Sequence, residues 1–224
     1  QMVPCIKMCP AHVDIPGYIA LAAEGDYAGC INLIRRDNPL PTACAMICEH
    51  PCEHRCRRQL IDAPLNIRGM KKFAVDQLPA DEAEVPEPLV PTGKKVAVIG
   101  GGPAGLTAAF FLAQMGHGVN LYERHDKLGG MLRYGIPNYR FPKDRLDEDI
   151  RAILAGGDIT VHCNSMVSTP ETIRAIADSH DALFVAIGAQ EGKKLRLDGV
   201  DAEGVDSAVA MLDAVSNGNP PDYT

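Results

Sequence analysis

The sequence lacks several features that would place it in large classes of protein. No apolar run approaches the roughly 18 residues that a membrane-spanning helix needs, so we expect no membrane span. Acidic residues outnumber basic ones, 29 to 22, which argues against nucleic acid as a partner. There is no internal repeat and no long biased tract. The 224 residues suffice for one large or two modest domains.

Composition divides the chain into four regions. Residues 1–79 contain most of the cysteines and three helical patterns, which we expect from Asp14, over 27–36 and over 66–77. Residues 80–93 form a linker rich in proline and acid, and such a stretch is expected to bury little. Residues 94–195 alternate strands with helices, which predicts a parallel α/β sheet. Residues 196–224 contain one expected helix, over 205–215.

The third region allows more detailed predictions. Helices are expected over 103–114, 145–154 and 170–177. Strands are expected over 96–99, 119–123, 159–161 and 182–187, and the apolar character of the last one predicts a central strand.

A glycine-rich loop joins the first of these strands to the helix after it. Its sequence fits G-x-G-x-x-G in the context that a dinucleotide-binding turn requires. Gly100 permits the tight turn, Gly102 lets the backbone approach a pyrophosphate, and Gly105 lets the helix pack on the sheet. Glu123 ends the next strand, where a carboxylate can accept hydrogen bonds from a ribose diol. The whole pattern predicts a dinucleotide site and disfavours a chance glycine turn.

Cysteine is concentrated at the start of the chain. The nucleotide loop favours an intracellular enzyme, in which clustered cysteines are more often metal ligands or redox groups than disulfides. Iron–sulfur clusters commonly use four thiolates, often beside proline, as at Cys9-Pro10. Zinc is the alternative, although its paired C-x2-C knuckles are absent. Cys30 and Cys163 lie in apolar stretches and are expected in the core. The clustered six are Cys5, Cys9, Cys44, Cys48, Cys52 and Cys56.

The segment after the glycine loop resembles the FAD domain of the glutamate synthase small-subunit family. That family includes flavin domains of dihydropyrimidine dehydrogenase and of NADH-dependent ferredoxin:NADP oxidoreductase. The likeness rests on residues 122–124, 128–132, 134–137, 140–143 and 186–189. It implies an FAD site, with an adenine contact through the backbone of Val167 and a charged Arg140 beside the flavin or its phosphates. The cofactor-binding residues implied are Gly100, Gly102, Pro103, Ala104, Gly105, Glu123, Arg124, Gly129, Gly130, Met131, Leu132, Ile136, Arg140, Val167, Ala186 and Gly188.

The first region resembles the same family's N-terminal domain, which holds two [4Fe–4S] clusters. The likeness rests on residues 14–19, 38–41 and 48–53. It implies metal ligands in two sets, Cys5 with Cys56 and Cys9 with Cys48 and Cys52, while Cys44 matches a position that does not ligate in relatives. Lys71 stands where several relatives have a Gln or Glu ligand, and a lysine is a poor iron ligand at neutral pH. The second cluster is therefore absent, recruits Cys44, or is completed in another way. A single four-thiolate site is a further alternative.

The resemblance implies a fold of class α/β, with an all-helical Fe–S domain followed by an incomplete Rossmann-like FAD domain. It also implies that the chain is a fragment of a larger flavoprotein, because relatives continue into an NAD(P)H-binding unit after a segment like 219–224. No second G-x-G-x-x-G is present in the sequence.

The function expected is an electron-transfer oxidoreductase subunit in the cytoplasm. NAD(P)H, FAD and one or two [4Fe–4S] clusters would pass electrons to a partner, such as a glutamate synthase large subunit, a ferredoxin or a hydrogenase-type protein. The cofactors carry such chemistry, so we name no catalytic side chain. The alternatives are a non-catalytic adaptor subunit and a zinc-stabilised nucleotide-binding protein. Five residues without triad-like neighbours are expected to be structural or exposed: His50, His54, His117, His125 and Tyr139.

Overall fold

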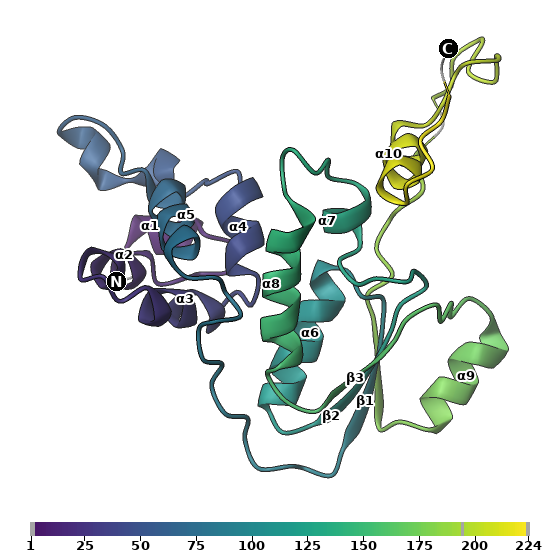
Figure 1. Cartoon of the computed structure of the whole chain (residues 1–224), viewed down its shortest axis with the longest axis horizontal. Coiled ribbons are helices and arrows are strands. Elements are labelled where there is room, and N and C mark those ends of the chain that lie inside the picture. The colour runs from purple at the N-terminus through teal and green to yellow at the C-terminus, as the bar shows by residue number, and fades with distance from the viewer. Residues whose placement is uncertain (1–2, 194, 223–224) are drawn as a thin grey trace.

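A computed structural model describes residues 3–193 and 195–222. The first region is entirely helical over its described residues, and Figure 1 shows its helices gathered on one side of the molecule. They are α1 (Pro4–Met8), α2 (Ile15–Ala23), α3 (Tyr27–Arg35), α4 (Pro41–Ile47), the 3₁₀ turns η1 (Glu53–Arg55) and η2 (Arg57–Leu60), and α5 (Ile67–Gln77).

Three of these helices begin with the same local device. The side chains of Asp14, Asp26 and Asn66 each accept a hydrogen bond from the backbone N–H three residues on, at 3.1, 2.8 and 3.0 Å. The donor is a glycine each time, and a Cβ there would lie within 3 Å of the capping side chain. This device explains why the three helices expected from sequence start where they do.

The third region, residues 94–195, contains a four-stranded parallel sheet with helices on both faces. Its strands are β1 (Lys95–Ile99), β2 (Gly118–Tyr122), β3 (Ile159–His162) and β4 (Ala182–Val185), in the order β3-β2-β1-β4. Helices α6 (Pro103–Gln114) and α8 (Lys143–Leu154) cover one face, and α9 (Pro170–Asp178) lies on the other (Figure 1). The short α7 (Met131–Tyr134) touches α10 (Ala208–Ser216). This arrangement agrees with the α/β class expected from sequence.

The strand expected to be central is an edge strand, so that prediction is wrong. Within the described residues β4 pairs with β1 alone, and Phe184, Val185 and Ile187 are 43%, 60% and 63% exposed. The pairing ends at Val185, two residues before the predicted end. An apolar run indicates a tendency to be buried, and it does not say which segment provides the burial.

The acidic linker is more buried than its composition suggests. Ala80 and Ala83 are almost fully buried and join Ile31 and Val75 in a small core. Arg35, 1% exposed, donates hydrogen bonds to the carbonyl oxygens of Ala80 and Ala83. The prediction that this stretch buries little therefore fails at its first four residues, because a buried arginine needs acceptors, and their backbone supplies two beside the side chain of Asn32.

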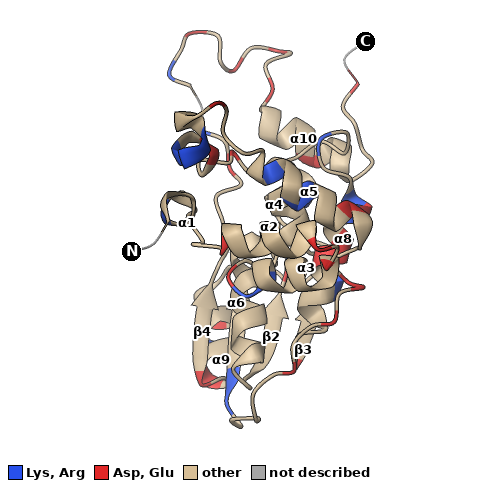
Figure 2. Ribbon diagram, turned by 90° about the vertical axis from the view of Figure 1, so that its left-hand side faces the viewer, with Lys and Arg blue, Asp and Glu red and all other residues tan. Residues whose placement is uncertain are grey.

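Charged side chains are distributed unevenly between the strands and the helices. Strands β2, β3 and β4 carry no Lys, Arg, Asp or Glu, whereas the helices and turns around α5 and α8 carry both signs (Figure 2). Two ion pairs connect α8 to earlier parts of the chain. Arg145 of α8 contacts Asp76 of α5, and Arg151 of α8 contacts Asp81 of the linker. Within the described residues, no helix is long and apolar enough to cross a bilayer.

Candidate functional site: a dinucleotide cleft and a cysteine cluster

The glycine loop has the tight geometry that its sequence predicts. Gly100 has a φ of +106°, and a Cβ on it would lie 2.3 Å from the carbonyl oxygen of Ala186. A Cβ on Gly105 would lie 1.8 Å from the carbonyl oxygen of Gly100. Gly102 differs, because its Cβ would meet only the Cα of Gly130, at 3.7 Å. Two glycines are thus required by the fold itself, while Gly102 leaves open space beside the start of α6.

The side chain of Glu123 faces the glycine loop and is also hydrogen-bonded to it. The carboxylate is 5% exposed, and its two oxygens accept hydrogen bonds from the backbone N–H groups of Gly101 and His125, at 2.7 and 2.9 Å. Each oxygen keeps further acceptor capacity, because an ionised carboxylate offers about four lone-pair sites. The residue predicted to accept from a ribose therefore also determines the shape of the loop.

A second glycine turn packs against the first. Gly129 and Gly130 have φ values of +125° and +50°, and the N–H of Gly129 donates to the carbonyl oxygen of Gly101 at 2.8 Å. Arg133 fixes this turn from behind, since its Nε donates to the carbonyl oxygen of Leu128 and its guanidinium pairs with Asp147. The two turns together form a wall of backbone without side-chain bulk.

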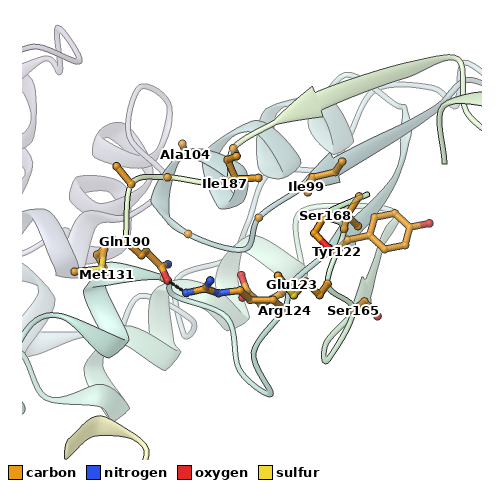
Figure 3. A pocket seen from close by; sticks show the side chains of 18 of the residues that line it. Ile99, Ala104, Tyr122, Glu123, Arg124, Met131, Ser165, Ser168, Ile187 and Gln190 are labelled. Carbon is orange, nitrogen blue, oxygen red and sulfur yellow. Dashed lines mark hydrogen bonds between the residues drawn. The ribbon is translucent and has the colours of Figure 1, made fainter. Parts of the chain in front are cut away.

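These turns border a cleft of about 710 Å³ at the carboxyl ends of the strands, where ligands bind in open parallel sheets. Figure 3 shows Tyr122, Ser165 and Ser168 at one end of the cleft, and Met131 and Gln190 at the other. Eleven of the predicted cofactor residues line it: Gly100, Gly102, Pro103, Ala104, Glu123, Arg124, Gly130, Met131, Val167, Ala186 and Gly188.

Five predicted cofactor residues do not line the cleft. Gly105 and Gly129 sit behind it, where they allow close packing. Leu132 and Ile136 pack in or against the main hydrophobic core. Arg140 is exposed outside the cleft, and its backbone N–H closes a turn onto Pro137.

Ten lining residues were not among the predicted contacts. They come mainly from the loops after β3 and β4, and the side chain of Arg124 donates a hydrogen bond to Gln190 from the second of these loops (Figure 3). Their position after parallel strands was the available signal, because such loops meet at one edge of a sheet. The ten are Ile99, Tyr122, Ser165, Met166, Ser168, Ile173, Ile187, Ala189, Gln190 and Glu191.

The clustered cysteines come together in the helical region. All eight cysteines are free thiols, so the disulfide alternative is not realised. Burial raises the pKa of Cys5, and the nearby Cys56 thiolate raises it further. The pKa of Cys52 is similarly affected by Cys9, and the pKa of Cys48 by Cys52. These couplings link Cys5 with Cys56, and Cys52 with Cys9 and Cys48, while the two ligand sets stay a prediction. Among the described residues, no three His, Cys, Asp or Glu side chains converge tightly enough for a single metal ion.

Hydrogen-bond donors point at three of the sulfurs. The backbone N–H of His50 donates to Cys48 Sγ at 3.3 Å, and that of Leu65 donates to Cys56 Sγ at 3.5 Å. Lys71 Nζ donates to Cys44 Sγ at 3.0 Å. Such donors favour thiolates and tune Fe–S clusters, so the residues present fit thiolate ligation.

The thiol pair at the end of α4 is polarised. A hydrogen bond from Cys44 lowers the pKa of Cys48 to about 6, against the opposing effect of burial. The same hydrogen bond, followed by burial, raises the pKa of Cys44. At neutral pH Cys48 is therefore ready to bind metal as a thiolate, and Cys44 must lose its proton to do so.

Fold and site together define the class: a cysteine-rich helical redox domain packed against a dinucleotide-binding parallel sheet. Residues 1–83 match the family described as dihydropyrimidine dehydrogenase domain II, 4Fe-4S cluster, and residues 98–157 match the NAD(P)-binding Rossmann-like domain. These matches make the chain similar to oxidoreductases of the dihydropyrimidine dehydrogenase and glutamate synthase small-subunit type.

Two curated relatives extend over most of the chain. The NADP(+)-dependent formate dehydrogenase subunit beta of Moorella thermoacetica is 39% identical over 88% of this chain and 31% of its own length. The NAD-dependent dihydropyrimidine dehydrogenase subunit PreT of Escherichia coli K12 is 35% identical over 87% of this chain and 47% of its own. The chain thus spans less than half the length of either relative.

Among solved structures, FprA of Mycobacterium tuberculosis in complex with NADPH matches with a TM-score of 0.48 and 21% identity. The match covers 54% of this chain and 28% of that one.

Proposed function

We propose that the chain forms the flavin- and cluster-bearing part of an electron-transfer oxidoreductase. The observation that carries this proposal is the direct packing of the two cofactor regions through α4 and α8. Helix α4 carries Cys44 in its last turn and is followed directly by Cys48. Helix α8 packs against α4 and against α6, whose first turn borders the cleft. A rigid contact of this kind holds two redox groups at a constant separation.

In this proposal the cleft holds FAD. The first turn of α6 offers the free N–H of Ala104 and a positive dipole end to the pyrophosphate, while Pro103, which has no N–H, begins the helix. Glu123 accepts hydrogen bonds from a ribose and disfavours a 2′-phosphate there. Val167, after β3, borders the end of the cleft assigned to the adenine. The cleft volume lies within the range of small-molecule and cofactor pockets.

The helical region holds the clusters in the two sets described above. When bound, FAD exchanges two electrons with a nicotinamide and the clusters pass electrons singly. Buried Cys52 and Cys56 lie where water has little access. The N–H groups of His50 and Leu65 stabilise negative charge on the sulfurs that they contact.

A nicotinamide donor and a partner subunit complete the proposal. The two relatives are subunits of an NADP(+)-dependent and an NAD-dependent enzyme, so the donor is NADPH or NADH. The acceptor is another redox subunit, such as a glutamate synthase large subunit, a ferredoxin or a hydrogenase-type protein. Such carriers operate in the cytoplasm, where thiols stay reduced.

The test is anaerobic purification of the full-length protein, with flavin identification by acid release, iron analysis and visible spectra. We expect about one FAD per chain and iron in multiples of about four. NADH or NADPH should bleach the flavin, and reduced-cluster signals should then appear by electron paramagnetic resonance (EPR). A folded protein that is colourless and free of iron would exclude the proposal.

A further inference from the structure

Lys71 is a buried cation in the middle of the cysteine cluster. It lies on α5, is 6% exposed, and donates a hydrogen bond of 3.0 Å to Cys44 Sγ. Its Nζ also lies 5.6 Å from the centroid of the fully buried Tyr18 ring. Neither the sulfur of a neutral thiol nor a ring face offers the full negative charge that a buried ammonium requires.

No carboxylate neutralises this ammonium among the described residues, whose ion pairs all involve other cations. A buried charge is retained where it is paired and hydrogen-bonded. Among the groups with a clearly shifted pKa, those that Lys71 affects are four cysteines: Cys30, Cys44, Cys48 and Cys52. Negative charge at this site must therefore come from thiolates.

Four sulfurs form a continuous group beside Lys71. Cys44 and Cys48 lie one helical turn apart at the end of α4, and their side chains hydrogen-bond to each other. Cys52 is electrostatically coupled to Cys48 on one side and to Cys9 on the other. Cys30 is fully buried in α3 and packs in the core around Tyr18. Lys71 thus adjoins Cys44, Cys48 and Cys52, and Cys9 joins this group through Cys52, whereas Cys30 is coupled to Lys71 but to none of these sulfurs.

We propose that Cys44 is the fourth ligand of the cluster bound by Cys9, Cys48 and Cys52, and that Lys71 donates a hydrogen bond to the Cys44 sulfur without binding iron. The inference rests on the iron–sulfur part of the proposed function. Cys44 releases its proton to solvent as its sulfur binds iron, so four thiolates complete the site with no redox change in the protein. Lys71 then has the negative charge that its burial requires.

The position of Lys71 has a consequence for electron transfer. Net charge and hydrogen bonds to sulfur set the reduction potential of a cluster. A fixed positive charge beside the Cys44 sulfur stabilises the reduced cluster, which carries one more negative charge. Lys71 is therefore a positioning residue that raises the potential of this cluster.

Three variants of the full-length protein, purified without oxygen, test the proposal. Cys44→Ala should lose about four irons per chain, or retain a three-iron form with its own EPR signal in the oxidised protein. Lys71→Met, which removes the charge without introducing the Gln or Glu ligand of relatives, should keep the iron of the wild type and show a lower midpoint potential for one cluster in an EPR-monitored titration. Cys30→Ala, a matched buried thiol, should change neither iron content nor potential. Circular dichroism and the signal of the remaining cluster report whether Cys44→Ala still folds.

Two results would overturn the inference. One is a Cys44→Ala protein with the iron content and EPR signals of the wild type. The other is loss of a cluster in Lys71→Met but not in Cys44→Ala, which would make residue 71 the ligand site. A wild type without iron would refute the underlying iron–sulfur proposal as well, whereas an iron-replete wild type with an unchanged Cys44→Ala refutes the fourth ligand alone.

Discussion

The buried carboxylate of Asp149 accepts a hydrogen bond of 3.0 Å from the backbone N–H of Thr42, which lies in the first turn of α4. Its other oxygen accepts from Ala43 at 2.8 Å. The first N–H groups of a helix have no partner within the helix, and here a residue of the nucleotide-binding region provides one. The helix that ends at the thiols is thus capped by the neighbouring region.

Replacing this carboxylate should weaken the contact between the two regions. Asp149→Asn can accept through one oxygen only, which leaves a buried N–H unpaired at a cost of about 1–3 kcal/mol. Chemical denaturation should show this loss in the free energy of unfolding. Asp178→Asn, at the exposed end of α9, is the control and should change it little. Equal effects of the two variants would contradict the capping role.

The same carboxyl predicts a pH dependence of stability. Burial, opposed by the N–H donors, raises the pKa of Asp149 to about 7, whereas an unfolded chain has a carboxyl pKa of about 4. Between these values the folded protein holds a proton that the unfolded chain has lost. The free energy of unfolding should therefore fall as pH rises from about 4 to about 7, and then level off. This slope should be reduced in Asp149→Asn, and an unchanged slope would assign it to other groups.

Alanine substitutions at two glycines of the loop should affect different properties, the stability of the fold and the affinity for FAD. Gly105→Ala places a methyl 1.8 Å from a backbone oxygen, so it should destabilise the fold by about 1–3 kcal/mol or more. Gly102→Ala meets nothing nearer than 3.7 Å, so the fold should survive. Its methyl enters the space proposed for the pyrophosphate, and FAD affinity should fall at least about tenfold, or 1.4 kcal/mol. Thermal unfolding and flavin fluorescence titration separate these effects, and an unchanged FAD affinity in Gly102→Ala would contradict the assigned site.

Glu123→Gln should impair the cleft more than its small change in size suggests. An amide has one acceptor oxygen, so it cannot satisfy both N–H groups that the carboxylate holds. We expect FAD affinity to fall about ten- to a hundredfold, or 1.4–2.8 kcal/mol. Glu191→Gln, an exposed acid on the same cleft, provides the control for lost charge. If both variants weaken binding equally, net charge and not loop geometry is responsible.

We expect Lys143 to stabilise the fold through hydrogen bonds to backbone carbonyl groups. Its ammonium donates to the carbonyl oxygens of Leu132, Ile136 and Phe141 at 2.9, 2.6 and 3.1 Å, and burial lowers its pKa. Lys143→Met leaves these acceptors unpaired, and we expect a loss of about 1–3 kcal/mol in unfolding free energy. Faster proteolysis of residues 132–141 than in the exposed Lys127→Met control would support this role, and equal rates would contradict it.

Local signals account for the parts of the fold that sequence predicts well. The Asp14, Asp26 and Asn66 caps act three residues away, and the glycine loop lies between adjacent elements, so a short window contains all partners. The start of α4 has no such signal, because its cap, Asp149, is remote in sequence. The edge position of β4 also depends on strand order, which apolar character alone does not determine.

The same distinction applies to the cleft. Gly100, Gly102 and Glu123 belong to one motif, and their positions follow from its pattern. Ser165 and Gln190 line the cleft because the loops after β3 and β4 end at the same edge of the sheet. Arg140 has the chemistry for a phosphate contact, yet the turn onto Pro137 keeps it outside. Residue type alone could not indicate that direction.

The anchoring of the linker by Arg35 determines where the chain can be divided for study. A truncation after Pro79 would leave the guanidinium buried without its acceptors at Ala80 and Ala83, so the isolated helical part would carry an uncompensated cation in its core. A cut among residues 84–92, whose side chains are mostly exposed, keeps that contact. Chimeras with relatives should therefore exchange residues 80–83 together with α3 and not with the sheet.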